Sequence, residues 1–164
     1  MPSFPIKSSS RTVLAPPREI TPEQLSWARG VVDANKGAPD GMVDGISDVV
    51  FAQDQIEMAE RTDPFELEIQ VFRIGQVGVV AFPGEFFVEY ALEIKSKSPA
   101  ELTPVVGLSN GSAGYVPTPE AFEQGGYEPT SWRFGKLAPK AGNMCVQSAT
   151  RQLEQLFKNG RREY

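Results

Sequence analysis

Two apolar segments, each followed by a turn that contains glycine, most constrain the fold of this chain. Residues 77–82 (VGVVAF) and 102–108 (LTPVVGL) are short runs rich in β-branched side chains, which is typical of strands buried inside a sheet. Glu85 follows the first run in a Pro-Gly-Glu turn, and Tyr115 ends the glycine-rich loop after the second. Ligands of open α/β sheets collect beyond the carboxyl ends of the strands, so the pattern predicts that this carboxylate and this phenol meet.

The rest of the pattern predicts a layered mixed β-sheet with flanking helices, an α/β fold. Residues 65–74 alternate apolar and polar side chains, as a half-buried strand does. Residues 1–18 contain several prolines and predict an extended lead-in with one short strand near residues 11–15. Helices are expected over residues 21–35, 47–61, 85–98, 118–124 and 142–159. The first of these begins with Thr-Pro-Glu-Gln, a strong capping sequence.

Length and composition exclude several classes of protein. The 164 residues suit a single domain or a piece of a larger one, and the net charge of −5 argues against nucleic-acid binding. No run reaches the ~18 apolar residues that a membrane-spanning helix requires. The first residues lack the apolar core of a signal peptide, so we expect the chain to be intracellular or to lack its original start.

The chain contains no histidine, which limits the chemistry that it can perform alone. A Ser-His-Asp triad, a Cys-His pair and a histidine-rich zinc motif are all excluded within these 164 residues. Cys145 is the single cysteine, so an internal disulfide is impossible, and we interpret it as a small buried residue of a helix. Any active site built here is expected to be half of a site.

The candidate residues each allow two interpretations when they are taken singly. Glu85 is predicted in the first turn of a helix, where the macrodipole stabilises an anion that can serve as a metal ligand or general base. It could equally be an acid that only satisfies the free N–H groups there. Tyr115, and Tyr127 in the next glycine turn, are either packed aromatic residues or functional phenols.

Taken together, these motifs resemble the C-terminal part of the catalytic domain of the neutral/alkaline (non-lysosomal) ceramidases. The matching segments are FPGEFF at residues 82–87, VVGLSNG at 105–111, GYVPT at 114–118 and GGYE at 125–128. Their order and spacing extend the resemblance over residues 65–157. It implies that residues 19–164 are the C-terminal portion of a ceramidase-like catalytic domain, and hence an incomplete part of a larger domain.

The resemblance implies a zinc-dependent amidohydrolase that splits N-acylsphingosine (ceramide) into sphingosine and a fatty acid. It assigns Glu85 and Tyr115 as metal ligands and places Tyr127 near the scissile amide as a catalytic residue. Members of the family take two further zinc ligands, both histidines, from their N-terminal half. We therefore expect zinc only together with those histidines, and a missing N-terminal half as partner beside a ceramide-like lipid amide. The resemblance also implies a secreted or periplasmic location, although the chain itself shows no signal peptide.

Two other functions stay open at this stage. The chain could be a non-catalytic remnant or binding module of the same fold, or part of a related zinc hydrolase that acts on a different amide or ester. Catalytic zinc normally needs three protein ligands, so the isolated chain is expected to be inactive. Exposed sheet edges also predict aggregation or low stability when it is made alone.

Overall fold

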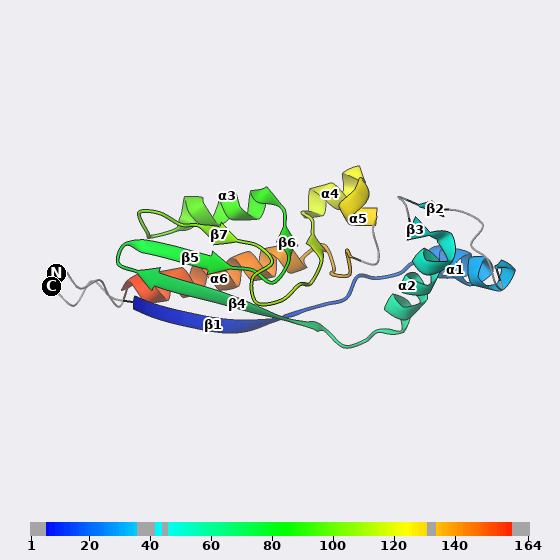
Figure 1. Ribbon diagram of the computed structural model, residues 1–164, viewed down its shortest axis with the longest axis horizontal. Helices are drawn as coiled ribbons and strands as arrows, with labels where there is room; N and C mark the ends of the chain where they lie inside the picture. The colour runs from blue at the N-terminus through cyan, green and yellow to red at the C-terminus, as the bar shows by residue number, and fades with distance from the viewer. Residues whose placement is uncertain (1–5, 36–41, 44–45, 131–133, 159–164) are drawn as a thin grey trace.

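A four-stranded mixed sheet forms the centre of the computed structural model, which describes residues 6–35, 42–43, 46–130 and 134–158 (Figure 1). Its strand order is β1-β4-β5-β7. Strand β4 (Phe65–Ile74) is antiparallel to both β1 (Ile6–Ala15) and β5 (Val77–Ala81), whereas β7 (Val105–Val106) runs parallel to β5. The predicted α/β class with a mixed sheet and flanking helices is confirmed.

The edge strand β1 is longer than the sequence predicted. It spans ten residues and pairs with β4 over its whole length, from Ile6 opposite Ile74 to Ala15 opposite Phe65. The segment predicted near residues 11–15 is only its second half, because the serines before it show no apolar alternation. Residues 1–5 of the predicted lead-in lie outside the described residues. The strand at residues 102–108 is shorter than predicted, since Pro104 cannot donate a backbone hydrogen bond.

Helices α3 (Val88–Lys97) and α6 (Ala141–Lys158) pack against each other and bury one face of the sheet (Figure 1). The contact is close enough to require glycine at two points. A Cβ atom on Gly78 would lie 2.6 Å from Leu153, and one on Gly142 would lie 2.2 Å from the Tyr90 ring. The largest fully buried side chains of this core include Phe82, Ile69, Ile94, Leu153, Val71, Val80, Val116, Val146 and Cys145.

The opposite face of the sheet, called the open face below, has no helix over it in the described part of the chain. Successive side chains of a strand point to opposite faces of the sheet, so the residues that alternate with the buried ones lie on this face. The open face consists of Ile6, Ser8, Ser10, Thr12, Leu14, Glu66, Glu68, Gln70, Phe72, Ile74, Val77 and Val79. Several of its apolar side chains are exposed, including Ile6, Leu14 and Ile74.

Helices α1 (Pro22–Ala34) and α2 (Asp48–Glu60) form a pair beyond one end of the sheet (Figure 1). The predicted capping box at Thr21 is present, with reciprocal hydrogen bonds to Gln24. The short strands β2 (Met42–Val43) and β3 (Ile46–Ser47) lie between the two helices in sequence. In the described residues, no helix has both the length and the apolar character needed to cross a bilayer.

Candidate functional site

Glu85 and Tyr115 lie directly opposite each other in a small parallel pair of strands. Strand β6 (Glu85–Phe86) pairs with β8 (Tyr115–Val116), with Glu85 in register with Tyr115. The Glu85 N–H donates to the Gly114 carbonyl at 2.8 Å, and the Phe87 N–H donates to the Val116 carbonyl at 3.2 Å. The structure thus brings together the carboxylate and the phenol that the sequence placed after two separate strands.

The predicted start of the third helix at Glu85 is wrong. Helix α3 begins at Val88, and the acid in its first turn is Glu89. Glu85 instead lies in strand β6, three residues before the helix begins, and its N–H donates to the Gly114 carbonyl. The macrodipole therefore does not explain its presence. Its exposed carboxylate is available for another role.

The loop of residues 107–114 sets the position of Tyr115 by interlocking with the turn that precedes Glu85. Three backbone hydrogen bonds join them: Ser109 N–H to Phe82 O at 2.9 Å, Leu108 N–H to Gly84 O at 3.0 Å, and Ala113 N–H to Pro83 O at 2.7 Å. The two turns that carry the candidate residues consequently form one backbone unit.

Gly114 allows this unit to pack against a third segment. Its φ of +77° lies in the left-handed region, and a Cβ atom there would lie 2.0 Å from the Phe134 carbonyl oxygen. That oxygen accepts a hydrogen bond from the Tyr115 N–H at 2.7 Å. Any side chain at position 114 would separate the two segments, so a close backbone contact within the protein accounts for this glycine.

Tyr127 joins the same cluster from the start of helix α5 (Tyr127–Thr130). Its ring meets the Tyr115 ring edge to face, with centroids 5.8 Å apart, and the Phe134 ring meets Tyr115 similarly at 6.2 Å. Tyr127 is 40% exposed, so its ring is accessible from solvent. All three residues predicted for the site are therefore placed within one region of the molecule.

The surroundings raise the pKa of the Tyr115 phenol above its ordinary value. Desolvation is the largest cause, followed by the negative charge of Glu85 and by smaller effects of Tyr127 and Glu128. A phenolate next to a carboxylate is unfavourable unless a cation lies between them. The phenol therefore stays protonated beside the carboxylate.

The described residues supply only part of a metal site. They contain no group of three or more His, Cys, Asp or Glu side chains that could hold a metal ion. A carboxylate and a phenol fit two positions of a zinc site, whereas catalytic zinc normally has three protein ligands. The donor set of this chain is chemically suitable but incomplete.

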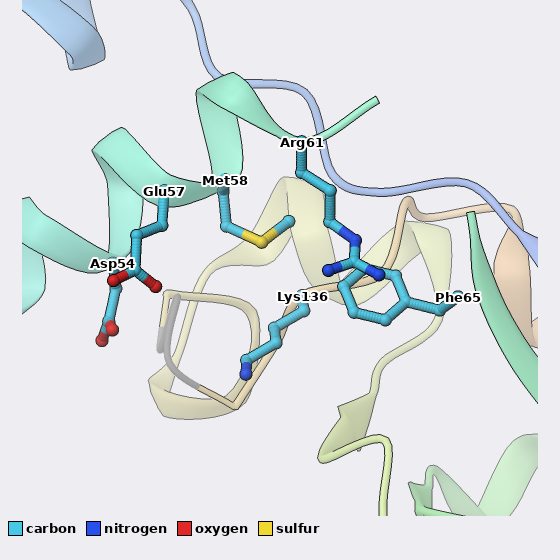
Figure 2. A pocket seen from close by; sticks show the side chains of 6 residues that line it. All are labelled: Asp54, Glu57, Met58, Arg61, Phe65 and Lys136. Carbon is cyan, nitrogen blue, oxygen red and sulfur yellow. The ribbon is translucent and has the colours of Figure 1, made fainter. Parts of the chain in front are cut away.

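Two hollows lie near these residues. The larger, about 320 Å³, is lined by Phe65, Ser112, Ala113, Gly114, Phe134 and Lys136 and thus adjoins the backbone unit of Tyr115. The smaller, about 110 Å³, shares Phe65 and Lys136 with it and is drawn in Figure 2, where the Arg61 guanidinium lies over the Phe65 ring. Its other lining residues, Asp54, Glu57 and Met58, come from α2.

The sequence indicated the glycine-rich loop that contributes Ser112, Ala113 and Gly114 to the larger hollow, but not the other lining residues. Phe134 and Lys136 belong to a segment without periodicity, and only the three-dimensional contact with Gly114 reveals them. The small hollow contains two basic and two acidic side chains, so its charges balance and it favours neither an anion nor a cation. Neither hollow is lined by Glu85, Tyr115 or Tyr127, but the larger one is lined by Gly114, which directly precedes Tyr115. The larger hollow is the one that matters for the candidate site.

Comparisons with known proteins find similarity to the same family that the sequence motifs resemble. The chain is 31% identical over 98 residues to neutral ceramidase 1 of Arabidopsis thaliana, covering 49% of this chain and 13% of that protein. No family model matches the chain.

Two solved structures share its fold. The neutral ceramidase from Pseudomonas aeruginosa matches with a TM-score of 0.57 and 21% identity, over 94% of this chain and 29% of that one. A ceramidase complexed with C2 matches with a TM-score of 0.57 and 20% identity, over 94% of this chain and 30% of that one. The chain thus spans less than a third of these proteins. The predicted resemblance is confirmed, and the chain has the fold of part of a neutral ceramidase-family domain.

Proposed function

We propose that this chain is part of a zinc-dependent amidohydrolase similar to neutral ceramidase. The reaction is hydrolysis of the amide bond of N-acylsphingosine, in which water is added and sphingosine and a fatty acid are released. The register of Glu85 with Tyr115 is the observation that most supports the proposal, because it pairs two oxygen donors that the sequence keeps apart. The similarity to proteins named ceramidases supports the class of reaction.

Glu85 and Tyr115 would be the zinc ligands supplied by this chain. The part of a ceramidase-like fold beyond this chain would be the partner that supplies the histidine ligands. Zinc, when bound, contributes Lewis-acid activation of the amide and of the attacking water. The raised pKa of Tyr115 keeps its phenol protonated near neutral pH, so cation binding there would release a proton.

Tyr127 is proposed to act on the substrate. Its exposed ring lies against Tyr115, so its hydroxyl can donate a hydrogen bond to an amide oxygen held beside the two ligands. Such a donor stabilises the negative charge that develops on that oxygen during attack. The hollow of about 320 Å³ next to Gly114 has the size of a small-molecule site and would hold part of the lipid.

The test is an activity assay of the chain joined with the remainder of a ceramidase-like domain and loaded with zinc. We expect release of fatty acid from N-acylsphingosine. Glu85→Gln and Tyr115→Phe should each lower the rate by on the order of 100-fold, through loss of zinc. Tyr127→Phe should lower the rate while zinc stays bound. Glu89→Gln, an exposed acid in the first turn of α3, is the matched control and should leave the rate unchanged.

Other outcomes select the alternatives. Hydrolysis of a different amide or ester, without action on ceramide, would identify a related zinc hydrolase. A folded, zinc-loaded preparation that cleaves none of these substrates would contradict the proposal and leave a non-catalytic remnant or binding module. In that case Glu85→Ala should change nothing except stability.

A further inference from the structure

Glu68 is the point on the open face where three separate hydrogen-bond donors converge. Its carboxylate accepts from the Ser10 hydroxyl of β1, from the Asn110 side-chain amide and from the Gln70 amide at 3.3 Å. Asn110 is 42 residues away along the chain, at the tip of the loop that precedes Tyr115. The contact therefore joins the middle of the sheet to the loop that carries a candidate ligand.

The tip of this loop needs support because its backbone is unfavourable. Leu108 and Asn110 have φ values of +51° and +64°, in the left-handed region, which Asn tolerates but which a bulky residue such as Leu seldom adopts. The base of the loop is held by the backbone hydrogen bonds to residues 82–84. At the tip, the bond from Asn110 to Glu68 reaches across to the sheet.

We propose that Glu68 is a positioning residue for the candidate site, which it stabilises by holding Asn110 and with it the whole loop of residues 107–114. Gly114 is the end of this loop and bonds to Glu85, so displacement of the tip would disturb the register of Glu85 with Tyr115. The role of the site rests on the proposed function, whereas the position of the loop depends on neither metal nor substrate.

Two physical points support a local role for Glu68. Hydrogen bonds to its carboxylate, first from Ser10 and then from Asn110 and Gln70, lower the pKa of Glu68, so it stays an ionised acceptor at neutral pH. Hydrogen bonds between exposed side chains contribute little to global stability, because water competes for both partners. Loss of the contact should therefore loosen the loop without unfolding the domain.

Amide hydrogen exchange of the full chain, without metal or substrate, tests this role. In Glu68→Ala we expect exchange at least about fivefold faster at the N–H groups of Glu85, Ser109 and Ala113. The N–H groups of the buried residues Gly78 and Val80, which bond to the carbonyls of Leu102 and Pro104, should change by less than about twofold. The nuclear Overhauser effect between the Tyr115 and Tyr127 rings should weaken at the same time.

Matched variants separate this role from a general loss of structure. Glu66→Ala removes an exposed acid from the same strand and face and should change none of these signals. Glu68→Gln keeps one acceptor oxygen and should give an intermediate result. Asn110→Asp keeps a residue that tolerates positive φ but places a like charge beside Glu68, so it should reproduce the loss.

Two results would overturn the inference. One is unchanged exchange at Ser109 and Ala113 in both Glu68→Ala and Asn110→Asp. The other is an equal increase at the Gly78 and Val80 amides, which would mean that Glu68 contributes only to overall stability. Because no zinc or ceramide is present, failure of the proposed function would leave this experiment unaffected, and a rigid loop in every variant would leave the proposed function standing.

Discussion

The two faces of the sheet differ sharply, although the same strands supply both. On the face beneath α3 and α6, the side chains of Leu67, Ile69, Val71 and Val80 are all at most 3% exposed. On the open face, Ile6, Leu14 and Ile74 are 75%, 55% and 47% exposed. Exposed apolar patches of this kind usually mark a surface that another element covers. The comparison indicates one completed layer and one uncompleted layer, in keeping with a chain that spans 29–30% of its structural relatives.

The largest expected effect comes from the completed layer. Leu153 is fully buried in α6 and contacts the sheet at Gly78. Leu153→Ala should therefore leave a cavity and lower the free energy of unfolding by about 2–5 kcal/mol. Chemical denaturation of the isolated chain measures this difference. A loss below about 1 kcal/mol would show that α6 is not firmly packed on the sheet and would remove the contrast between the faces.

Alkaline pH should weaken the same layer through Cys145. Burial raises the pKa of its thiol from its ordinary value of 9.0 to about 12. The thiol ionises near pH 9 in the unfolded chain but only near pH 12 in the folded one. Its contribution to folding stability is therefore complete below about pH 9 and is lost as the pH rises toward 12. Wild-type stability should thus fall by roughly 2 kcal/mol more than that of Cys145→Ala between pH 8 and pH 10.5, because each pKa unit corresponds to about 1.4 kcal/mol.

The measurement is denaturation of both proteins across this pH range. The difference between the two pH profiles isolates the contribution of position 145. The thiol of the folded wild type should also react slowly with an aromatic disulfide reagent at pH 8. If the stabilities of wild type and Cys145→Ala changed in parallel with pH, the thiol would not be buried away from water in this layer.

The sequence could predict the completed layer because its signals are local. Strand β4 coincides with the segment of alternating apolar and polar residues, and α1 begins at a capping box that four consecutive residues encode. Strand β1 was recognised only in part, since Ser8 to Ser10 owe their conformation to pairing with β4, more than fifty residues away.

The proximity of Glu85, Tyr115 and Tyr127 agrees with the sequence pattern, but their local structure was not predicted. Glu85 lies in a strand instead of a helix because its N–H is bonded to Gly114, a contact between segments distant in the sequence. Likewise, no pattern marks Phe134, whose backbone fixes Tyr115 and whose ring packs against it. Propensity describes each segment alone and cannot report which distant partner it meets.

A smaller effect is expected at the site itself, where the charge of Glu85 can be removed without altering shape. Glu85→Gln should lower the pKa of Tyr115 toward its ordinary value, because a negative neighbour no longer opposes formation of the phenolate. The residual elevation should reflect desolvation, which is the larger cause. Titration of ¹³C-labelled tyrosine by nuclear magnetic resonance follows each ring separately. Glu89→Gln is the control, and an equal Tyr115 pKa in Glu85→Gln and wild type would show that the two side chains do not face each other.

The smallest effect on stability is expected on the open face. Leu14 is largely exposed, so Leu14→Ala should change the free energy of unfolding of the isolated chain by less than about 0.5 kcal/mol. The difference between this loss of stability and the loss in Leu153→Ala measures how far the two faces differ in solution.

Leu14→Lys should likewise preserve stability and reduce self-association, because a charge on an edge strand discourages pairing with a second chain. Sedimentation at several concentrations follows the association. A contrary result would be a loss of stability in Leu14→Ala that equals the loss in Leu153→Ala and grows with protein concentration. It would mean that the open face is buried between two copies of the chain, so the two faces would differ only in the monomer.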